Sequence, residues 1–222
     1  MTLRALLLDF GGTLARERVP RSAIYTAAGR RHGAILDEEE VGARMREALQ
    51  QLPREIGGAS RYSDRWFGAF IERVFRGHVT TGEALGSLAT ELIQTFSDSS
   101  TYTLFPDVSP LLARAQGMRV GVVSNWGPRL STLLGGLGVE ADLALTSALE
   151  RLEKPDPALF QRALTGLGVT AGEALHVGDR LDTDVLGARA AGIRPVLLDR
   201  SGRMSTPPGL RVVRSLEDLE LT

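Results

Sequence analysis

The stretch LRALLLDFGGTL, residues 3–14, constrains the fold of this chain more than any other stretch. Its apolar run up to Leu8 is nearly continuous, as in central parallel strands that helices cover on both faces. Asp9 ends the run, and Gly11 and Gly12 allow a sharp turn beside it. An aspartate in a turn is an ordinary way to leave a strand. The carboxyl end of a strand is also where open α/β sheets bind their ligands. Whether Asp9 has a structural or a functional role therefore depends on the rest of the chain.

Composition excludes several classes of protein. The 222 residues, 43% of them hydrophobic, can bury the core of one large domain or of one domain with an insertion. A balance of 26 basic and 27 acidic residues indicates neither a nucleic-acid nor a membrane partner. The absence of cysteine excludes disulfides, thiolate zinc sites and thiol nucleophiles. The N-terminal apolar run is too short for a signal peptide or a membrane span, so we expect a soluble, cytoplasmic protein. The sequence does not determine its oligomeric state.

From residue 15 to about residue 103 the pattern is helical. Asp37 with Glu40, and Thr80 with Glu83, have the spacing of capping boxes, in which side chains satisfy free N–H groups at a helix start. Apolar residues recur at helical spacing over residues 41–52, 66–75 and 85–96. This segment is predicted to form three or four helices packed as a small bundle, with the aromatic residues around Trp66 in its core.

From Asp107 onward helical and strand patterns alternate, which predicts parallel β-α units. Strands are expected at residues 119–124, 143–146, 175–177, 195–198 and 212–213. Between them, Asp156 and Pro157 have the types preferred at a helix N-cap and at the first helical position. The fold class is therefore α/β, with a parallel sheet.

The ends of these expected strands carry polar residues of compatible chemistry: Asp9, Ser124, Asn125, Lys154, Asp179 and Asp184. Each has a plain structural explanation, such as a helix cap for Ser124. Lys154, however, is the only lysine among the 26 basic residues, which invites a specific explanation. Together the residues describe a phosphoryl-transfer site. A carboxylate can attack phosphorus, a hydroxyl and a lysine can hold the transferring oxygens, and two further carboxylates can help to hold Mg²⁺.

The order and flanks of these residues resemble the haloacid dehalogenase-like superfamily. The matching segments are DFGGTL, VVSN, KPDPALF and GDRLDTD, in the order of the four motifs of that family. The resemblance implies a Rossmann-like sheet of strand order 5-4-1-2-3. It also implies a core formed by residues 1–14 and 104–222, with an inserted all-α helical-bundle cap at residues 15–103.

Roles follow from the resemblance, motif by motif. Asp9 would be the nucleophile, and Ser124, Asn125 and Lys154 would bind phosphate. The Mg²⁺ environment would be Asp9, the Gly11 carbonyl, Asp179 and Asp184. Asp182 matches no motif position. The implied partner is a small phosphorylated metabolite, which the sequence does not name.

One position departs from the family pattern. Efficient phosphatases of this family have an aspartate two residues after the nucleophile, where it protonates the leaving group and then activates water; here this position is Gly11. A positioned acid-base group contributes about 10²–10⁴-fold in rate.

Four interpretations follow from this departure. The first is a weak or specialised Mg²⁺-dependent phosphatase, and the second a protein that binds phosphorylated ligands without turnover. The third is a 2-haloacid dehalogenase, which the pair Asp179 and Asp184 disfavours, because such enzymes need no metal. The fourth, a phosphonoacetaldehyde hydrolase, would need a cap lysine, and residues 15–103 contain none.

Overall fold

The computed structural model describes residues 2–204 and 208–221; Met1, residues 205–207 and Thr222, all within the segments predicted as core, lie outside the described residues. A six-stranded parallel sheet organises the C-terminal part of the chain together with the first strand. Its strands are β1 (Ala5–Leu8), β6 (Arg119–Ser124), β7 (Leu143–Thr146), β8 (Ala174–Gly178), β9 (Arg194–Leu198) and β10 (Arg211–Val213). The order is β10-β9-β8-β1-β6-β7. The expected order 5-4-1-2-3 is confirmed, with β10 added at one edge.

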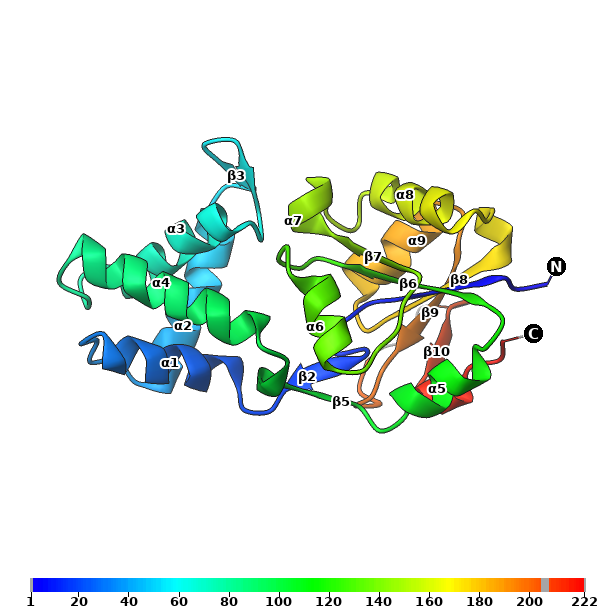
Figure 1. The fold of residues 1–222 in the computed structure, drawn as a ribbon, viewed down its shortest axis with the longest axis horizontal. Helices are drawn as coiled ribbons and strands as arrows, with labels where there is room; N and C mark the ends of the chain where they lie inside the picture. Colours follow the sequence, from blue (N-terminus) through cyan, green and yellow to red (C-terminus); the bar gives the residue numbers. More distant parts are fainter. Residues whose placement is uncertain (1, 205–207, 222) are drawn as a thin grey trace.

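Helices cover both faces of this sheet, as the apolar run of β1 predicts (Figure 1). Leu6 and Leu8 point to one face, where they join a cluster with helices α5 (Val108–Arg114) and α6 (Leu130–Gly136). Ala5 and Leu7 point to the other face, where they pack with α8 (Pro157–Leu167) and α9 (Leu186–Ala190). All four side chains of β1 are completely buried. Successive residues of a strand point to opposite faces, so a strand covered on both sides has to be apolar throughout.

The inserted segment, residues 15–103, contains four α-helices: α1 (Arg21–Arg31), α2 (Glu38–Gln51), α3 (Asp64–Phe75) and α4 (Gly82–Ser97). They pack around a hydrophobic cluster of their own, which includes Trp66, and form a separate lobe beside the sheet (Figure 1). The capping box of Asp37 and Glu40 is formed as predicted. At α4 the prediction was wrong by one residue. Thr81, whose backbone is extended, is the N-cap and accepts a hydrogen bond from the Ala84 N–H group at 3.1 Å.

The inserted segment also contains short strands that the sequence did not predict. β3 (Glu55–Ile56) and β4 (Ala59–Ser60) form a hairpin, so the segment is not entirely helical as expected. β2 (Ala15–Glu17) pairs with β5 (Tyr102–Leu104) in an antiparallel ribbon where the chain leaves and re-enters the sheet lobe. Figure 1 shows this ribbon between the two lobes. Among the described residues, no helix is long and apolar enough to cross a membrane.

The remaining helical elements are short. α7 (Ser147–Glu150) follows β7, and a π-helical turn, η3 (Leu181–Val185), leads into α9. Three 3₁₀ turns are η1 (Ser99–Thr101), η2 (Ala171–Glu173) and η4 (Leu216–Asp218). Several of these short elements lie at the carboxyl ends of strands, where they shape the loops that carry the polar residues.

Candidate active site

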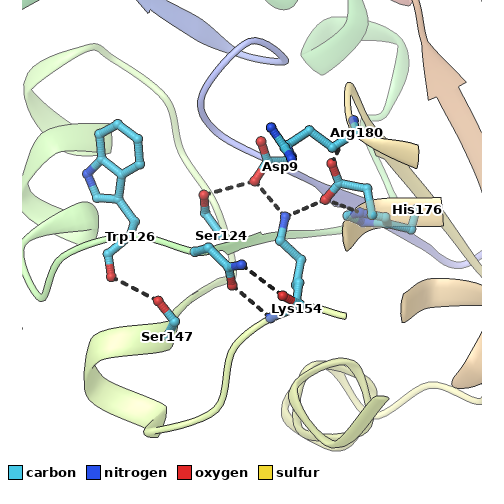
Figure 2. A network of polar contacts seen from close by, with 9 residues as sticks. Asp9, Ser124, Trp126, Ser147, Lys154, His176 and Arg180 are labelled. Atoms are coloured by element: carbon cyan, nitrogen blue, oxygen red, sulfur yellow. Dashed lines mark hydrogen bonds and ion pairs between the residues drawn. The ribbon is translucent and has the colours of Figure 1, made fainter. Parts of the chain in front are cut away.

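The polar residues singled out in the sequence meet at the carboxyl edge of the sheet. Asp9 directly follows β1 and Ser124 ends β6. Lys154 lies in the loop before α8, and Asp184 lies in η3, after β8. Figure 2 shows Ser124, Lys154 and Asp9 directed toward one another. The carboxyl ends of neighbouring parallel strands share one edge of a sheet, so residues far apart in sequence become neighbours there.

Asp9 is held by two donors on one oxygen. The Ser124 hydroxyl donates to its Oδ1 at 2.8 Å, and the Lys154 ammonium donates to the same atom at 2.6 Å. Ser124 is therefore not a helix cap, because the next helix begins only at Leu130 and its N-cap is Arg129. Burial raises the pKa of Asp9, although the Lys154 charge opposes this effect. These contacts fix the orientation of the Asp9 carboxylate, which is buried.

Lys154 is buried, with 3% of its surface exposed, and its ammonium contacts both Asp9 and Asp184. Burial alone would lower the pKa of Lys154, but the two carboxylates raise it. A lysine that is buried between two acids remains a cation. The only lysine of the chain is thus a part of the site and not a surface residue.

Asn125 holds the backbone of Lys154. Its side-chain Nδ2 donates to the Lys154 carbonyl at 2.9 Å, and its Oδ1 accepts from the Lys154 N–H group at 2.7 Å. The sequence predicted Asn125 as a phosphate-binding group. The structure places its amide on the lysine loop, so its observed contacts position Lys154.

Three carboxylates form a cluster that can hold a metal ion. One oxygen from each of Asp9, Asp179 and Asp184 lies within 4.8 Å of the other two. Asp179 Oδ1 is buried and has no hydrogen-bond partner among the described residues. Burial and the charges of Asp9 and Asp184 raise the pKa of Asp179 to about 6. Carboxylate oxygens are the ligands that Mg²⁺ prefers, and a cation would satisfy this orphaned oxygen. The donor set fits Mg²⁺.

Asp184 is fixed by more contacts than the sequence indicated. Burial would raise its pKa, but the Lys154 charge and the contact with His176 lower it. His176 lies on β8 and is completely buried, with Nε2 at 3.3 Å from Asp184 Oδ1. The Arg180 N–H group donates to Asp184 Oδ2 at 3.1 Å. The sequence analysis missed His176. The available signal was a lone histidine at a strand position that should be apolar.

Glycines next to these acids allow the chain to approach closely. Gly12 has φ of +79°, and a Cβ there would lie 2.4 Å from Asp179 Oδ2. A Cβ on Gly178 would lie 2.2 Å from Asp184 Cγ. Any larger side chain at either position would displace a carboxylate of the cluster. Asp182, which matched no motif position, is exposed and pairs with Arg180, outside the cluster.

Gly11 is different, because its backbone is not among those with positive φ. It lines the same cavity as Asp9, Ser124 and Lys154. A Cβ on Gly11 would lie 3.3 Å from the indole ring of Trp126. Trp126 packs edge-on against Phe10 at a centroid distance of 4.9 Å. The place beside Gly11 is therefore bordered by an aromatic ring, which the sequence analysis did not identify.

Arg200 supports the loop that follows Asp9. Its guanidinium donates to the Thr13 carbonyl at 2.8 Å and to Asp107 Oδ2 at 2.7 Å, and it stacks over Phe105 at 3.8 Å. Asp107 also accepts from the Leu216 N–H group at 2.9 Å. No motif drew attention to Arg200 or Asp107, because both are ordinary charged residues in loops.

Comparison with known proteins agrees with this geometry. The sequence profile described as haloacid dehalogenase-like hydrolase matches residues 3–192. The chain belongs to this hydrolase family. A phosphoserine phosphatase from Thermus thermophilus is 34% identical to it, over 95% of each chain.

Solved structures of this family share the fold. A HAD phosphatase from Thermococcus onnurineus superimposes with a TM-score of 0.67 at 25% identity, covering 97% of this chain and 95% of the other. A 2-haloacid dehalogenase from Pseudomonas syringae pv. tomato superimposes with a TM-score of 0.72 at 21% identity, covering 97% and 96%. The fold neighbours thus include both a phosphatase and a dehalogenase, so the fold alone does not separate these two activities.

Proposed function

We propose that this hydrolase is a Mg²⁺-dependent phosphatase that acts on small phosphorylated metabolites, with Asp9 as its nucleophile. The cluster of Asp9, Asp179 and Asp184 is the observation that carries the proposal. The Lys154 ammonium contacts two of these carboxylates, and Asp179 has a buried oxygen without a hydrogen-bond partner among the described residues. An enzyme that attacks carbon without a metal has no use for such an excess of negative charge. The similarity to a protein named phosphoserine phosphatase points the same way.

The first half of the reaction forms a bond between an Asp9 oxygen and phosphorus. As that bond forms, the bond from phosphorus to the ester oxygen breaks, and the leaving oxygen takes the electron pair. Ser124 and Lys154, which already donate to Asp9, would also donate to the transferring phosphoryl oxygens. Asn125 keeps Lys154 in place through its two hydrogen bonds to the lysine backbone.

The second half of the reaction hydrolyses the aspartyl phosphate. Water attacks phosphorus, the bond from phosphorus to the Asp9 oxygen breaks, and the Asp9 carboxylate takes the electron pair, while both protons of the water remain on the inorganic phosphate that leaves. Neither half can use a carboxylic acid at position 11, because this residue is Gly11. Leaving groups that depart without a proton should therefore react best, and the aspartyl phosphate should persist.

Asp9, Asp179, Asp184 and the Gly11 carbonyl would hold the magnesium ion. When bound, Mg²⁺ would neutralise phosphoryl oxygens and lower the pKa of the carboxylates that burial has raised. The residues at 15–103 would form a cap over the site. Their contribution to the cavity around Asp9 includes Arg54, Arg61 and Tyr62.

Chelation tests this proposal directly. Hydrolysis of an activated ester such as p-nitrophenyl phosphate should disappear with EDTA and return with added Mg²⁺. Asp179→Ala should lower this activity by at least about 10²-fold, as expected when a preorganised electrostatic contact to the transition state is lost. Asp182→Ala, a nearby exposed acid outside the cluster, is the matched control and should keep the activity. Activity that survives both EDTA and Asp179→Ala would overturn the metal assignment, and halide release from 2-haloacids would then identify a dehalogenase.

A further inference from the structure

A second cavity, of about 120 Å³, lies between the inserted helices and the sheet lobe. We call it the aromatic chamber, because five rings line it: Tyr25, Tyr62, Phe67, Phe96 and Trp126. Tyr62, Asn125 and Trp126 also line the cavity around Asp9. The two spaces therefore adjoin each other along a common wall.

Trp126 places this wall on the leaving-group side of the site. Its ring stands 3.3 Å from where a Cβ on Gly11 would lie. Under the proposed function, position 11 faces the oxygen that leaves phosphorus. The backbone of Trp126 is itself fixed, since its carbonyl accepts a hydrogen bond from the Ser147 hydroxyl at 3.4 Å (Figure 2). A leaving group that departs from phosphorus would thus begin beside Trp126 and extend toward the chamber.

The charged residues that line the aromatic chamber are neutralised by neighbours. Arg21 pairs with Glu17 at 2.8 Å, and its guanidinium lies 5.2 Å from the Phe96 ring centroid and 5.5 Å from that of Trp126. Asp64 accepts two hydrogen bonds from Arg129, at 2.8 and 2.6 Å. Ion pairs formed within the protein offer little to a charged leaving group such as an amino acid. An uncharged ring, in contrast, would gain both apolar contact and edge or face contacts with the aromatic walls.

The volume of the aromatic chamber sets the size of its occupant. An apolar cavity of about 150 Å³ in another protein binds benzene, and the chamber, at about 120 Å³, is of the same order. It has room for one ring.

We propose that the substrate is a phosphate monoester of a phenol with a single ring, and that this ring binds in the aromatic chamber. This inference rests on the proposed function and names its substrate class. In the first half-reaction the bond from phosphorus to the phenolic oxygen breaks, and the phenolate departs with the electron pair and then takes a proton from solvent. A phenolate needs less help from an acid than an alkoxide does, which suits a site with Gly11 in place of the acid.

Binding of two phosphonates that cannot be hydrolysed tests the inference without relying on turnover. Phenylphosphonate and methylphosphonate carry the same anionic group, so a difference in their calorimetric affinities for the full chain with Mg²⁺ reports on the ring. Phenylphosphonate should bind at least about tenfold more tightly, as expected for burial of a ring. Equal affinities would overturn the inference.

A filled chamber supplies the matched variant. Ile93 is half-buried and lines the aromatic chamber. Ile93→Phe should therefore fill the chamber and reduce the ratio of the two affinities to about one. Ile35→Phe adds the same ring where the side chain is 92% exposed and should leave the ratio unchanged. A ratio that survives Ile93→Phe in a variant that circular dichroism shows to be folded would place the ring elsewhere and overturn the assignment.

The outcomes also separate this inference from the proposed function. Preferred binding of phenylphosphonate without hydrolysis of any phosphate ester would support the chamber and contradict the phosphatase. Hydrolysis of phosphoserine with a higher kcat/KM than that of phenyl phosphate would support the phosphatase and overturn the chamber. A protein that binds neither phosphonate would contradict both.

Discussion

Lys154 balances part of the negative charge of the site. The ammonium lies between Asp9 and Asp184 and is closed off from solvent. Every other basic residue of the chain except the histidines is an arginine, so a general cation would have been an arginine here as well. A compact ammonium can donate to both acids at once, whereas a guanidinium is a wider, planar group whose donors have a fixed fork geometry.

We therefore expect Lys154→Arg to lower turnover of an aryl phosphate by at least about 10²-fold, as for loss of a preorganised donor. Lys154→Ala should lower this turnover by no more than Lys154→Arg does, because an arginine does not restore the lost contact geometry. Steady-state kinetics of both variants, with circular dichroism to verify folding, would measure this. Turnover near the wild-type value in Lys154→Arg would show that the lysine is incidental.

Gly11 is the residue that limits the reaction in this account. Its φ lies outside the positive range, so its backbone accepts an aspartate, and the new Cβ would only need Trp126 to shift by a few tenths of an ångström. We expect Gly11→Asp to raise turnover by at least about tenfold, and most for alkyl phosphates, whose leaving groups need a proton.

Gly12→Asp is the control for this change, since a Cβ on Gly12 would lie 2.4 Å from Asp179 Oδ2 in a backbone with φ of +79°. It should abolish activity and Mg²⁺ binding. A folded, metal-binding Gly11→Asp protein with no gain on any ester would contradict the account of the missing acid.

At the scale of elements, Asp107 joins three segments behind the site. Its carboxylate accepts hydrogen bonds from Arg200, Ser215 and the Leu216 N–H group, and so connects the start of α5 to the ends of β9 and β10. Arg200 in turn donates to the Thr13 carbonyl in the loop that follows Asp9. Burial would raise the pKa of Asp107, but these hydrogen bonds lower it below 3.8.

A lowered pKa in the folded state contributes stability above the unfolded pKa, and this contribution disappears as the pH falls through the folded value. We expect Asp107→Asn to reduce the free energy of unfolding at pH 7 by about 2 kcal/mol. The difference from the wild type should shrink as the pH falls below 3.8. Urea unfolding at several pH values measures it, with the exposed Asp182→Asn as control. A difference that is constant with pH would show that the Asp107 charge does not matter.

The elements that the sequence predicted well are those with long patterns. The strands β1 and β6 have apolar runs that only a buried strand explains, and the helices around Trp66 repeat an apolar residue every three or four positions. The hairpin of β3 and β4 and the ribbon of β2 and β5 have two or three residues per strand. Such strands are too short to show a period, so tertiary contacts decide them.

At the scale of the whole molecule, two lobes with separate hydrophobic clusters meet over one site. Ion pairs cross between the lobes: Arg54 with Glu153, Arg129 with Asp64, and Arg151 with Glu55. Exposed ion pairs of this kind contribute about 0–1 kcal/mol of stabilisation each. They help to orient the lobes but add little to the free energy that holds the lobes together. Tyr62 lies where the lobes meet and lines both cavities, in a left-handed backbone with φ of 70°.

The residues that gather in the site could be predicted from the sequence. The residues that hold them in place could not. The structure brings Asp9, Ser124, Lys154, Asp179 and Asp184 together, because each lies at or after the carboxyl end of a strand of one parallel sheet. Trp126, His176 and Arg200 act through packing and through contacts between distant segments, which no local spacing reports.

Trapping the covalent intermediate tests the central claim most directly. The full chain is mixed with phenyl phosphate and Mg²⁺, quenched with acid within the first turnovers, and digested for mass spectrometry. The account predicts one phosphate on Asp9 in a substantial fraction of the protein, because Gly11 cannot speed its hydrolysis. The label should be absent with EDTA and in Asp9→Asn. Phosphate release with no label on Asp9 at any quench time, or equal turnover in Asp9→Asn, would contradict the account.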